Sequence, residues 1–159
     1  MRGQVSADNM AEAPASAVWE AYRGLEPSKL INQLLGDVIG KVEVVHGDGG
    51  PGTILKLTFH PGTSGPAYAK EVIITMDDEK LVKEGEVIEG GFKELGFDFY
   101  HMRVEIIEKD SASTIIRSTI TYELDDTEAE LASLVTTKPL EIVAEAFAKY
   151  VTAMKSANE

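Results

Sequence analysis

The chain has 159 residues, 43% hydrophobic and 26% charged, and this composition predicts one soluble globular domain over residues 1–159. Because 27 Asp and Glu outnumber 15 Lys and Arg, the formal net charge is −12, which disfavours nucleic acid and anionic membranes as partners. The absence of cysteine excludes disulfides and thiolate catalysis, and the first residues lead into no apolar segment, so we expect a cytoplasmic monomer.

The first third of the chain predicts one strand followed by two short helices. Residues 3–12 alternate weakly and are expected to form an edge strand. Pro14 suits the start of the first helix and Pro27 that of the second, which Gly36 ends. Both segments carry apolar side chains at helical spacing. These are Val18, Trp19 and Tyr22 in the first helix and Leu30, Ile31, Leu34 and Leu35 in the second.

From Val38 onward the hydrophobic period changes to two, which predicts six further strands. The first two flank the glycine-rich turn 47–53, and tight turns between neighbouring strands indicate an antiparallel meander. The first contains Val42 and Val44, the second Leu55, Leu57 and Phe59, and the remaining four are expected at 67–76, 80–89, 95–108 and 113–124.

The segment 126–155 predicts a long amphipathic helix. Thr127 and Glu130 fit a capping box at its start, and Pro139 is expected to kink or break it. After this proline, apolar side chains recur every three or four residues and form one stripe. The stripe consists of Leu140, Val143, Phe147, Val151 and Met154. Because such a stripe must be buried, we predict that the helix packs against a curved sheet and that the functional site lies between them.

The element order and three motifs resemble the plant pathogenesis-related class ten proteins, the birch-pollen-allergen-like family. The motifs are the glycine loop 47–53, the Val-Ile-Glu-Gly-Gly run at 87–91 and the Leu-Val-Thr-Thr stretch at 134–137. The resemblance covers essentially the whole chain and is strongest to the branch of norcoclaurine and norbelladine synthases. It implies an α+β fold in which a seven-stranded antiparallel sheet curls around the long C-terminal helix and encloses a cavity, the helix-grip arrangement.

Tyr68, Glu71 and Lys83 stand where that branch places its catalytic tyrosine, glutamate and lysine. Alternation along the strand turns Lys83 inward with Val87, and Glu71 inward with Ile73. Inside a cavity, desolvation would lower the lysine pKa and leave a neutral amine as base or nucleophile, with the glutamate relaying protons. The alternatives are a solvated lysine and a carboxylate on the rim paired with a surface lysine.

Tyr68 lies three residues before Glu71, so a regular strand would turn the two side chains to opposite faces. Both face inward only if a bulge lies near Ala69 and Lys70, and we predict that bulge. The resemblance then implies that Tyr68 hydrogen-bonds the aldehyde oxygen at the cavity entrance.

Met102 stands where norcoclaurine synthase has an inward catalytic aspartate, whereas norbelladine synthase also has an apolar residue there, so ring closure is in doubt. Asp98 shares the parity of Met102 and would return a carboxylate to the cavity mouth; the alternative is an aspartate in water at the strand end. Tyr100, Tyr122 and Phe147 are candidates for lining the cavity, with packing in the core as the alternative.

The three histidines, His46, His60 and His101, lack the spacing of metal ligands, so no metal site is expected. The glycine loop joins two strands and lacks a Gly-Lys-Ser/Thr ending, which favours a structural turn over a phosphate-binding loop.

Two functions follow from this reading. The first is a lyase of alkaloid biosynthesis that condenses an arylethylamine such as tyramine or dopamine with an aromatic or arylacetic aldehyde, without a cofactor. Its candidate catalytic residues are Lys83, Glu71 and Tyr68, and its candidate substrate-binding residues are Asp98, Tyr100, Met102, Tyr122 and Phe147. The second is a non-catalytic carrier of an apolar plant metabolite or hormone, in which the lysine would be the counter-charge to an acidic ligand.

Overall fold

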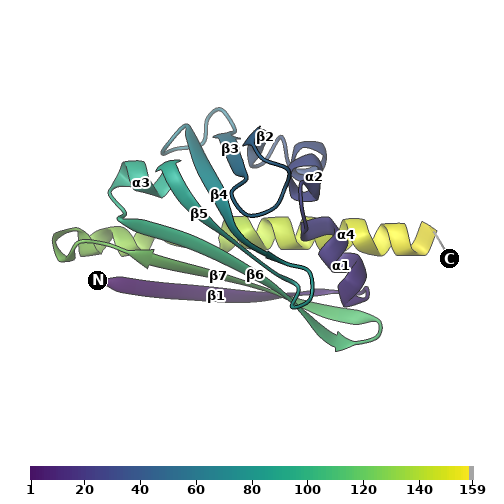
Figure 1. Cartoon of the computed structure of the whole chain (residues 1–159). Coiled ribbons are helices and arrows are strands. Elements are labelled where there is room, and N and C mark those ends of the chain that lie inside the picture. The colour runs from purple at the N-terminus through teal and green to yellow at the C-terminus, as the bar shows by residue number, and fades with distance from the viewer. Residues whose placement is uncertain (158–159) are drawn as a thin grey trace.

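A seven-stranded antiparallel sheet curls around one long helix in the computed structural model, which describes residues 1–157 (Figure 1). The strands are β1 (Arg2–Ala11), β2 (Gly40–His46), β3 (Ile54–Phe59), β4 (Tyr68–Asp77), β5 (Val82–Gly90), β6 (Phe99–Asp110) and β7 (Ser113–Glu123). The helices are α1 (Ala15–Tyr22), α2 (Glu26–Leu34), α3 (Gly91–Leu95), the 3-10 helix η1 (Asp126–Leu134) and α4 (Lys138–Ala157). This is the predicted fold.

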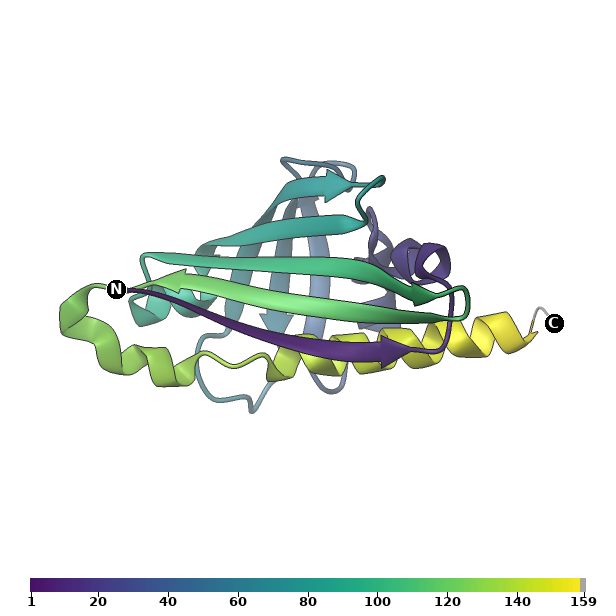
Figure 2. The same cartoon turned by 90° about the horizontal axis from the view of Figure 1, so that it is seen from below.

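The sheet order is β1-β7-β6-β5-β4-β3-β2, so strands β2 to β7 form the predicted meander and β1 pairs with the last strand. β1 and β2 are the two edges, as expected for residues 3–12. The chain start lies beside η1, where the Met1 amino group forms an ion pair of 2.9 Å with Asp126, and α4 runs on past the end of β1 (Figure 2). None of the helices in the described part of the chain has the length and apolar character needed to cross a membrane.

The C-terminal segment is divided into two helices rather than one. The chain breaks between η1 and α4 just before Pro139, as predicted. The predicted capping box is wrong, because the cap is Asp125. Its carboxylate accepts hydrogen bonds from the Thr127 backbone N–H at 2.9 Å and from the Thr127 hydroxyl at 2.7 Å, and Glu130 takes no part.

The apolar stripe of α4 is buried in its middle, at Phe147 and Val151, while Leu140 and Val143 nearer its start are half-buried. Phe147 is fully buried and meets the Tyr22 ring edge-on, with the ring centroids 5.0 Å apart. The stripe ends at Val151, because Met154 is 47% exposed. α4 therefore forms one wall of the interior, and its last turns extend beyond the sheet.

The Gly90–Gly91 pair, which lies between two of the predicted strands, leads into the short helix α3. Both glycines have positive φ, 66° and 50°. A Cβ on Gly90 would lie 2.4 Å from the Tyr68 carbonyl oxygen, and one on Gly91 would lie 2.9 Å from the Ala69 Cβ. Only glycine fits both the backbone conformation and the space here, and the turn places α3 across the open end of the sheet.

The glycine-rich loop 47–53 is held by the protein itself. The buried Thr53 hydroxyl accepts a hydrogen bond from the Gly49 N–H at 2.9 Å, and the Gly52 N–H donates to the Ile73 carbonyl at 2.8 Å. A Cβ on Gly49 would lie 2.8 Å from the Gly24 Cα, so this loop packs directly on the α1–α2 connection. These contacts agree with the predicted structural turn.

Candidate active site

A cavity of about 530 Å³ lies between the concave face of the sheet and α4. Residues of strands β2 to β7 line it, mostly at alternate positions, because successive side chains of a strand point to opposite faces. Three of these strands, β4 to β6, carry the residues that matter for the chemistry. Their alternate lining residues are Ala69, Glu71 and Ile73 of β4, Lys83, Gly85 and Val87 of β5, and Tyr100, Met102 and Val104 of β6. α4 contributes Pro139, Leu140, Val143 and Phe147. The cavity lining is thus mostly apolar, with a few polar groups among it.

The cavity opens toward solvent beside α3. Several residues that line it are exposed: residues 63–65 of the β3–β4 loop, Leu95 of α3 (37% exposed), and Leu134 of η1 (48% exposed). These three segments surround the mouth. A ligand can therefore enter between the β3–β4 loop, α3 and the η1–α4 connection.

Glu71 and Lys83 lie inside this cavity, as strand alternation predicted. They come from neighbouring strands, where Glu71 pairs with Val87 and Met76 with Lys83. Protein surrounds both side chains, and each keeps some accessible surface because the cavity itself admits water. No ion pair within 4.0 Å joins them to each other or to any other residue of the described chain. Their polar atoms are available to a ligand.

Burial brings the pKa values of Glu71 and Lys83 closer together. It lowers the pKa of Lys83 to about 8, against the opposing charge of Glu71. It also raises the pKa of Glu71, against the opposing charge of Lys83. In both cases desolvation of the charged form is the larger cause. A fraction of Lys83 is therefore neutral near pH 8 and can accept a proton, and Glu71 holds its proton more tightly than an exposed carboxyl group, so both groups suit proton transfer.

Tyr100, Met102 and Phe147 line the cavity as expected. The Tyr100 ring stacks on Phe92 with 4.1 Å between centroids, and both burial and the nearby charge of Glu71 raise the pKa of its phenol. Its hydroxyl is therefore a neutral donor at physiological pH. Met102 supplies no proton-transferring group at its position.

Two of the predicted substrate-binding residues lie outside the cavity. Asp98 is exposed to solvent, so the prediction that it restores a carboxylate at the mouth is wrong and the alternative holds. Tyr122 is only 7% exposed but packs in the core, with its ring 5.8 Å from that of Phe97, and is absent from the cavity lining. Packing is its observed role.

The predicted inward orientation of Tyr68 is also wrong. Its hydroxyl donates a 2.8 Å hydrogen bond to Glu89 on the outer face, and the ring lies under the Lys56 ammonium at 5.2 Å. A bulge does occur nearby, but the extra residue is Ile88 on the partner strand β5. The parity of β4 is therefore unbroken from Tyr68 to Glu71, and the buried Ala69 occupies the inward position before Glu71. The sequence did contain a signal for this: Ala69 lies two residues before Glu71, and residues two apart in a regular strand point to the same face.

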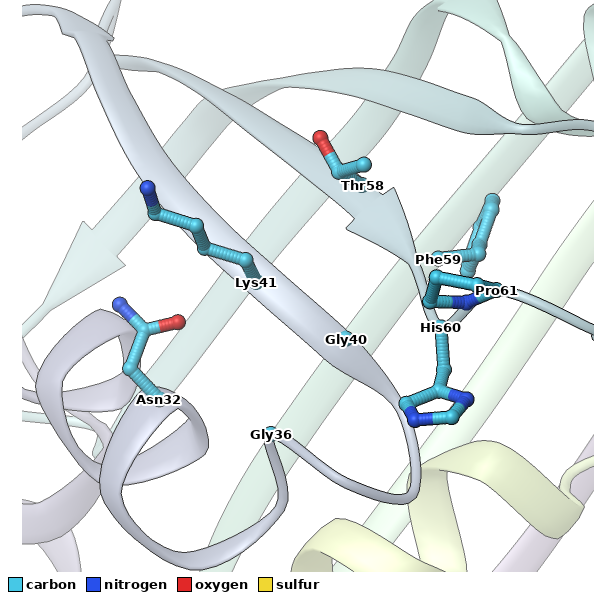
Figure 3. A pocket seen from close by; sticks show the side chains of 8 residues that line it. All are labelled: Asn32, Gly36, Gly40, Lys41, Thr58, Phe59, His60 and Pro61. Carbon is cyan, nitrogen blue, oxygen red and sulfur yellow. The ribbon is translucent and has the colours of Figure 1, made fainter.

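A second depression, of about 440 Å³, lies outside the sheet between α2 and the β2–β3 edge (Figure 3). It is lined by Asn32, Gly36, Gly40, Lys41, Thr58, Phe59, His60 and Pro61. The Asn32 amide is already engaged, since it donates to the Val42 carbonyl at 2.8 Å and accepts from the Val42 N–H at 2.7 Å. This contact covers the edge strand β2. The other ionisable side chains of the depression, Lys41 and His60, are exposed to solvent, unlike the cavity pair.

Within residues 1–157 no three His, Cys, Asp or Glu side chains gather in a way that could hold a metal ion. His101 instead contacts the Glu84 carboxylate at 2.8 Å on the outer face.

Comparison with known proteins decides the family. Residues 1–154 match the model of the pathogenesis-related protein Bet v 1 family. The chain belongs to this family. The predicted resemblance is thereby confirmed, and the fold and cavity above are those of a Bet v 1 family member.

Among its relatives, this Bet v 1 family protein is 41% identical to norbelladine synthase of Narcissus pseudonarcissus over 156 residues, covering 98% of this chain and 96% of the relative. It is 40% identical to S-norcoclaurine synthase 2 of Papaver somniferum over 144 residues, covering 88% of this chain but only 62% of the relative.

Solved structures of norcoclaurine synthase from Thalictrum flavum share the fold. A point mutant in complex with a transition-state analogue superposes with a TM-score of 0.90 at 31% identity, covering 98% of this chain and 97% of the other. The complex with dopamine and hydroxybenzaldehyde gives a TM-score of 0.87 at 31% identity, covering 96% and 88% of the two chains.

Proposed function

We propose that this protein condenses an arylethylamine of the tyramine or dopamine type with an aromatic or arylacetic aldehyde inside its cavity. One observation carries the proposal: a cavity with mostly apolar walls holds one buried amine, Lys83, and one buried carboxyl group, Glu71. Burial lowers the pKa of the amine and raises the pKa of the carboxyl group. The relatives support the same reaction class, because one solved neighbour holds dopamine and hydroxybenzaldehyde together.

In the net reaction both N–H protons of the amine leave the nitrogen and two protons reach the carbonyl oxygen, and no cofactor is needed. The amine nitrogen attacks the carbonyl carbon, its N–H proton passes to a base, and the former carbonyl oxygen is protonated to give a carbinolamine. The C–O bond then breaks as the hydroxyl takes up a proton, which releases one water and leaves an iminium ion. Loss of the second N–H proton to a base gives the imine. Neutral Lys83 is the proposed base, and protonated Glu71 is the proposed acid for the departing water. The apolar walls align the two reactants and exclude bulk water.

Met102 favours the imine as the product. Ring closure requires a further proton to leave an aromatic carbon, and this position of the cavity wall holds a thioether, which is no base. Glu71 is the buried carboxyl group of the cavity, whereas Glu84, which also borders it, is paired with His101 and Arg103. We therefore expect condensation without an efficient second step.

The test is product formation above the uncatalysed background. Purified protein is mixed with tyramine or dopamine and with 4-hydroxyphenylacetaldehyde or 3,4-dihydroxybenzaldehyde. The products are separated by chromatography and identified by mass spectrometry. The imine and its cyclised isomer have equal mass, so half of each sample is first reduced with borohydride, which adds two hydrogens to the imine alone. No rate above background with any pair would contradict the proposal.

Carriage of an apolar metabolite is the second candidate. It is favoured by the cavity volume of about 530 Å³ and by the largely apolar walls, which suit a small hydrophobic ligand whether or not it reacts. Lys83 would then pair with an acidic ligand group. A protein that binds the amines or the aldehydes with no turnover would favour this function over the first.

Tyr68→Phe is expected to leave turnover nearly unchanged, well short of the roughly 10²–10⁴-fold loss that is typical for a proton-transfer residue. The reason is that the hydroxyl bonds Glu89 on the outer face and does not reach the cavity. Steady-state kinetics on the variant measure this directly. A loss as large as that of Glu71→Gln, the matched cavity variant, would show that the tyrosine turns inward during the reaction.

A further inference from the structure

Gly85 lies in the middle of β5, on the cavity face, between Lys83 and Val87. Its neighbours across the sheet are Ile73 of β4 and Met102 of β6. Glycine in a strand interior weakens the strand, because it loses more backbone freedom on folding than other residues and presents no side chain for packing. Such a glycine marks a bulge, a bend or a close approach of something to the backbone.

No feature of the described fold requires glycine at this position. Its backbone lies outside the left-handed region, unlike that of Gly90. A Cβ on Gly85 would lie 3.4 Å from the Val72 carbonyl oxygen and 3.9 Å from Glu71 Oε2, and both are ordinary van der Waals distances. A bulge occurs opposite, but its extra residue, Ile74, belongs to β4. Neither turn geometry nor internal packing therefore explains the glycine.

Because Gly85 has no side chain, the cavity is wider beside the Glu71 carboxylate. The space over Gly85 is bordered by the Glu71 carboxylate, whose Oε2 is the nearest side-chain atom, and Met102 pairs with Gly85 on the neighbouring strand. A flat ring can lie against bare backbone at this point, whereas a branched side chain would fill the same volume.

We propose that Gly85 determines specificity by leaving open a subsite for the aromatic ring of the arylethylamine, beside the Glu71 carboxylate. The choice of an arylethylamine as ligand rests on the proposed function. The new element is the position of its aromatic ring, over the backbone of Gly85. A side chain at position 85 excludes the ring, and the effect grows with the size of that side chain.

The experiment measures binding of amines alone by isothermal titration calorimetry, with no aldehyde present. Wild type, Gly85→Ala and Gly85→Val are compared for tyramine, dopamine and 2-phenylethylamine. Gly50→Ala is the matched control, because Gly50 also has an ordinary backbone conformation and room for a Cβ, which would lie 3.5 Å from Asp48 Oδ1. Gly50 lies in the β2–β3 loop, away from the cavity. Melting temperatures of all four proteins are recorded.

Gly85→Val is expected to weaken binding of all three amines by about tenfold or more, the scale for excluding one apolar group from a pocket. Gly85→Ala should weaken it less, Gly50→Ala should not change it, and none of these variants should melt below wild type. Unchanged affinity in Gly85→Val, or wild-type protein that binds none of the amines, would overturn the inference. A lower melting temperature for Gly85→Ala would also overturn it, because packing would then require the glycine. Binding without turnover would contradict only the proposed reaction.

Discussion

Replacing Lys83 by methionine is expected to lower kcat/KM for the amine–aldehyde condensation by about 10²–10⁴-fold, the usual contribution of a proton-transfer group. The methionine keeps a long side chain in the cavity but cannot accept a proton. Glu71 then lacks its basic partner, and the reaction loses its proposed base. Because the apolar walls remain, affinity for the aromatic amine should stay close to that of wild type. Rates and affinities are measured on the same preparation.

Lys56→Met is the matched control, since Lys56 lies over the Tyr68 ring on the outer face. The folded pKa of Lys83, about 8, is below its ordinary value of 10.5, so the folded state binds fewer protons than the unfolded state between these values. Stability therefore rises with pH through this range, and the charged lysine is unfavourable at pH 7. Lys83→Met should consequently not lower the melting temperature at that pH. Full turnover in Lys83→Met would contradict the role of Lys83 as the base, whereas altered affinity with no turnover in either protein would support a carrier.

Phe147→Ala is expected to lower the free energy of unfolding by about 3–5 kcal/mol, the range for truncating a buried aromatic side chain. Phe147 is fully buried, meets the Tyr22 ring edge-on and joins α4 to the rest of the core. For a chain of this size, each kcal/mol corresponds to about 2–4 °C in melting temperature. Urea denaturation followed by circular dichroism measures the change.

Met154→Ala serves as the control for this helix. It lies two turns further along the same stripe but is 47% exposed, so its truncation should change stability by no more than about 0.5 kcal/mol. Equal losses for Phe147→Ala and Met154→Ala would contradict the account of how α4 packs.

Strand alternation was sufficient to predict the inward groups. Glu71, Lys83, Tyr100 and Met102 all line the cavity, because side-chain direction in a strand is a local property with a period of two. Tyr68 was mispredicted because its direction depends on which strand of a pair carries the extra residue. That is fixed by the register between β4 and β5, and therefore by contacts distant in sequence.

Other parts of the site depended on packing that local sequence does not determine. Tyr100 and Tyr122 are paired directly across β6 and β7, yet one lines the cavity and the other fills the core beside Phe97. The helix α3 has only five residues, too few for a periodic signal, although it covers the open end of the sheet. The volume left empty between sheet and α4 likewise follows from how all these side chains pack.

The central claim is that the buried Lys83 and Glu71 carry out the chemistry, and the dependence of kcat/KM on pH tests it most directly. Wild type and Lys83→Met are measured from pH 6 to about 10 with the same amine and aldehyde. The ratio of the two rates is taken at each pH, so that ionisation of the reactants cancels. If neutral Lys83 is the base, this ratio rises with pH through about 8 and then levels. A ratio that stays flat across the range would contradict the claim.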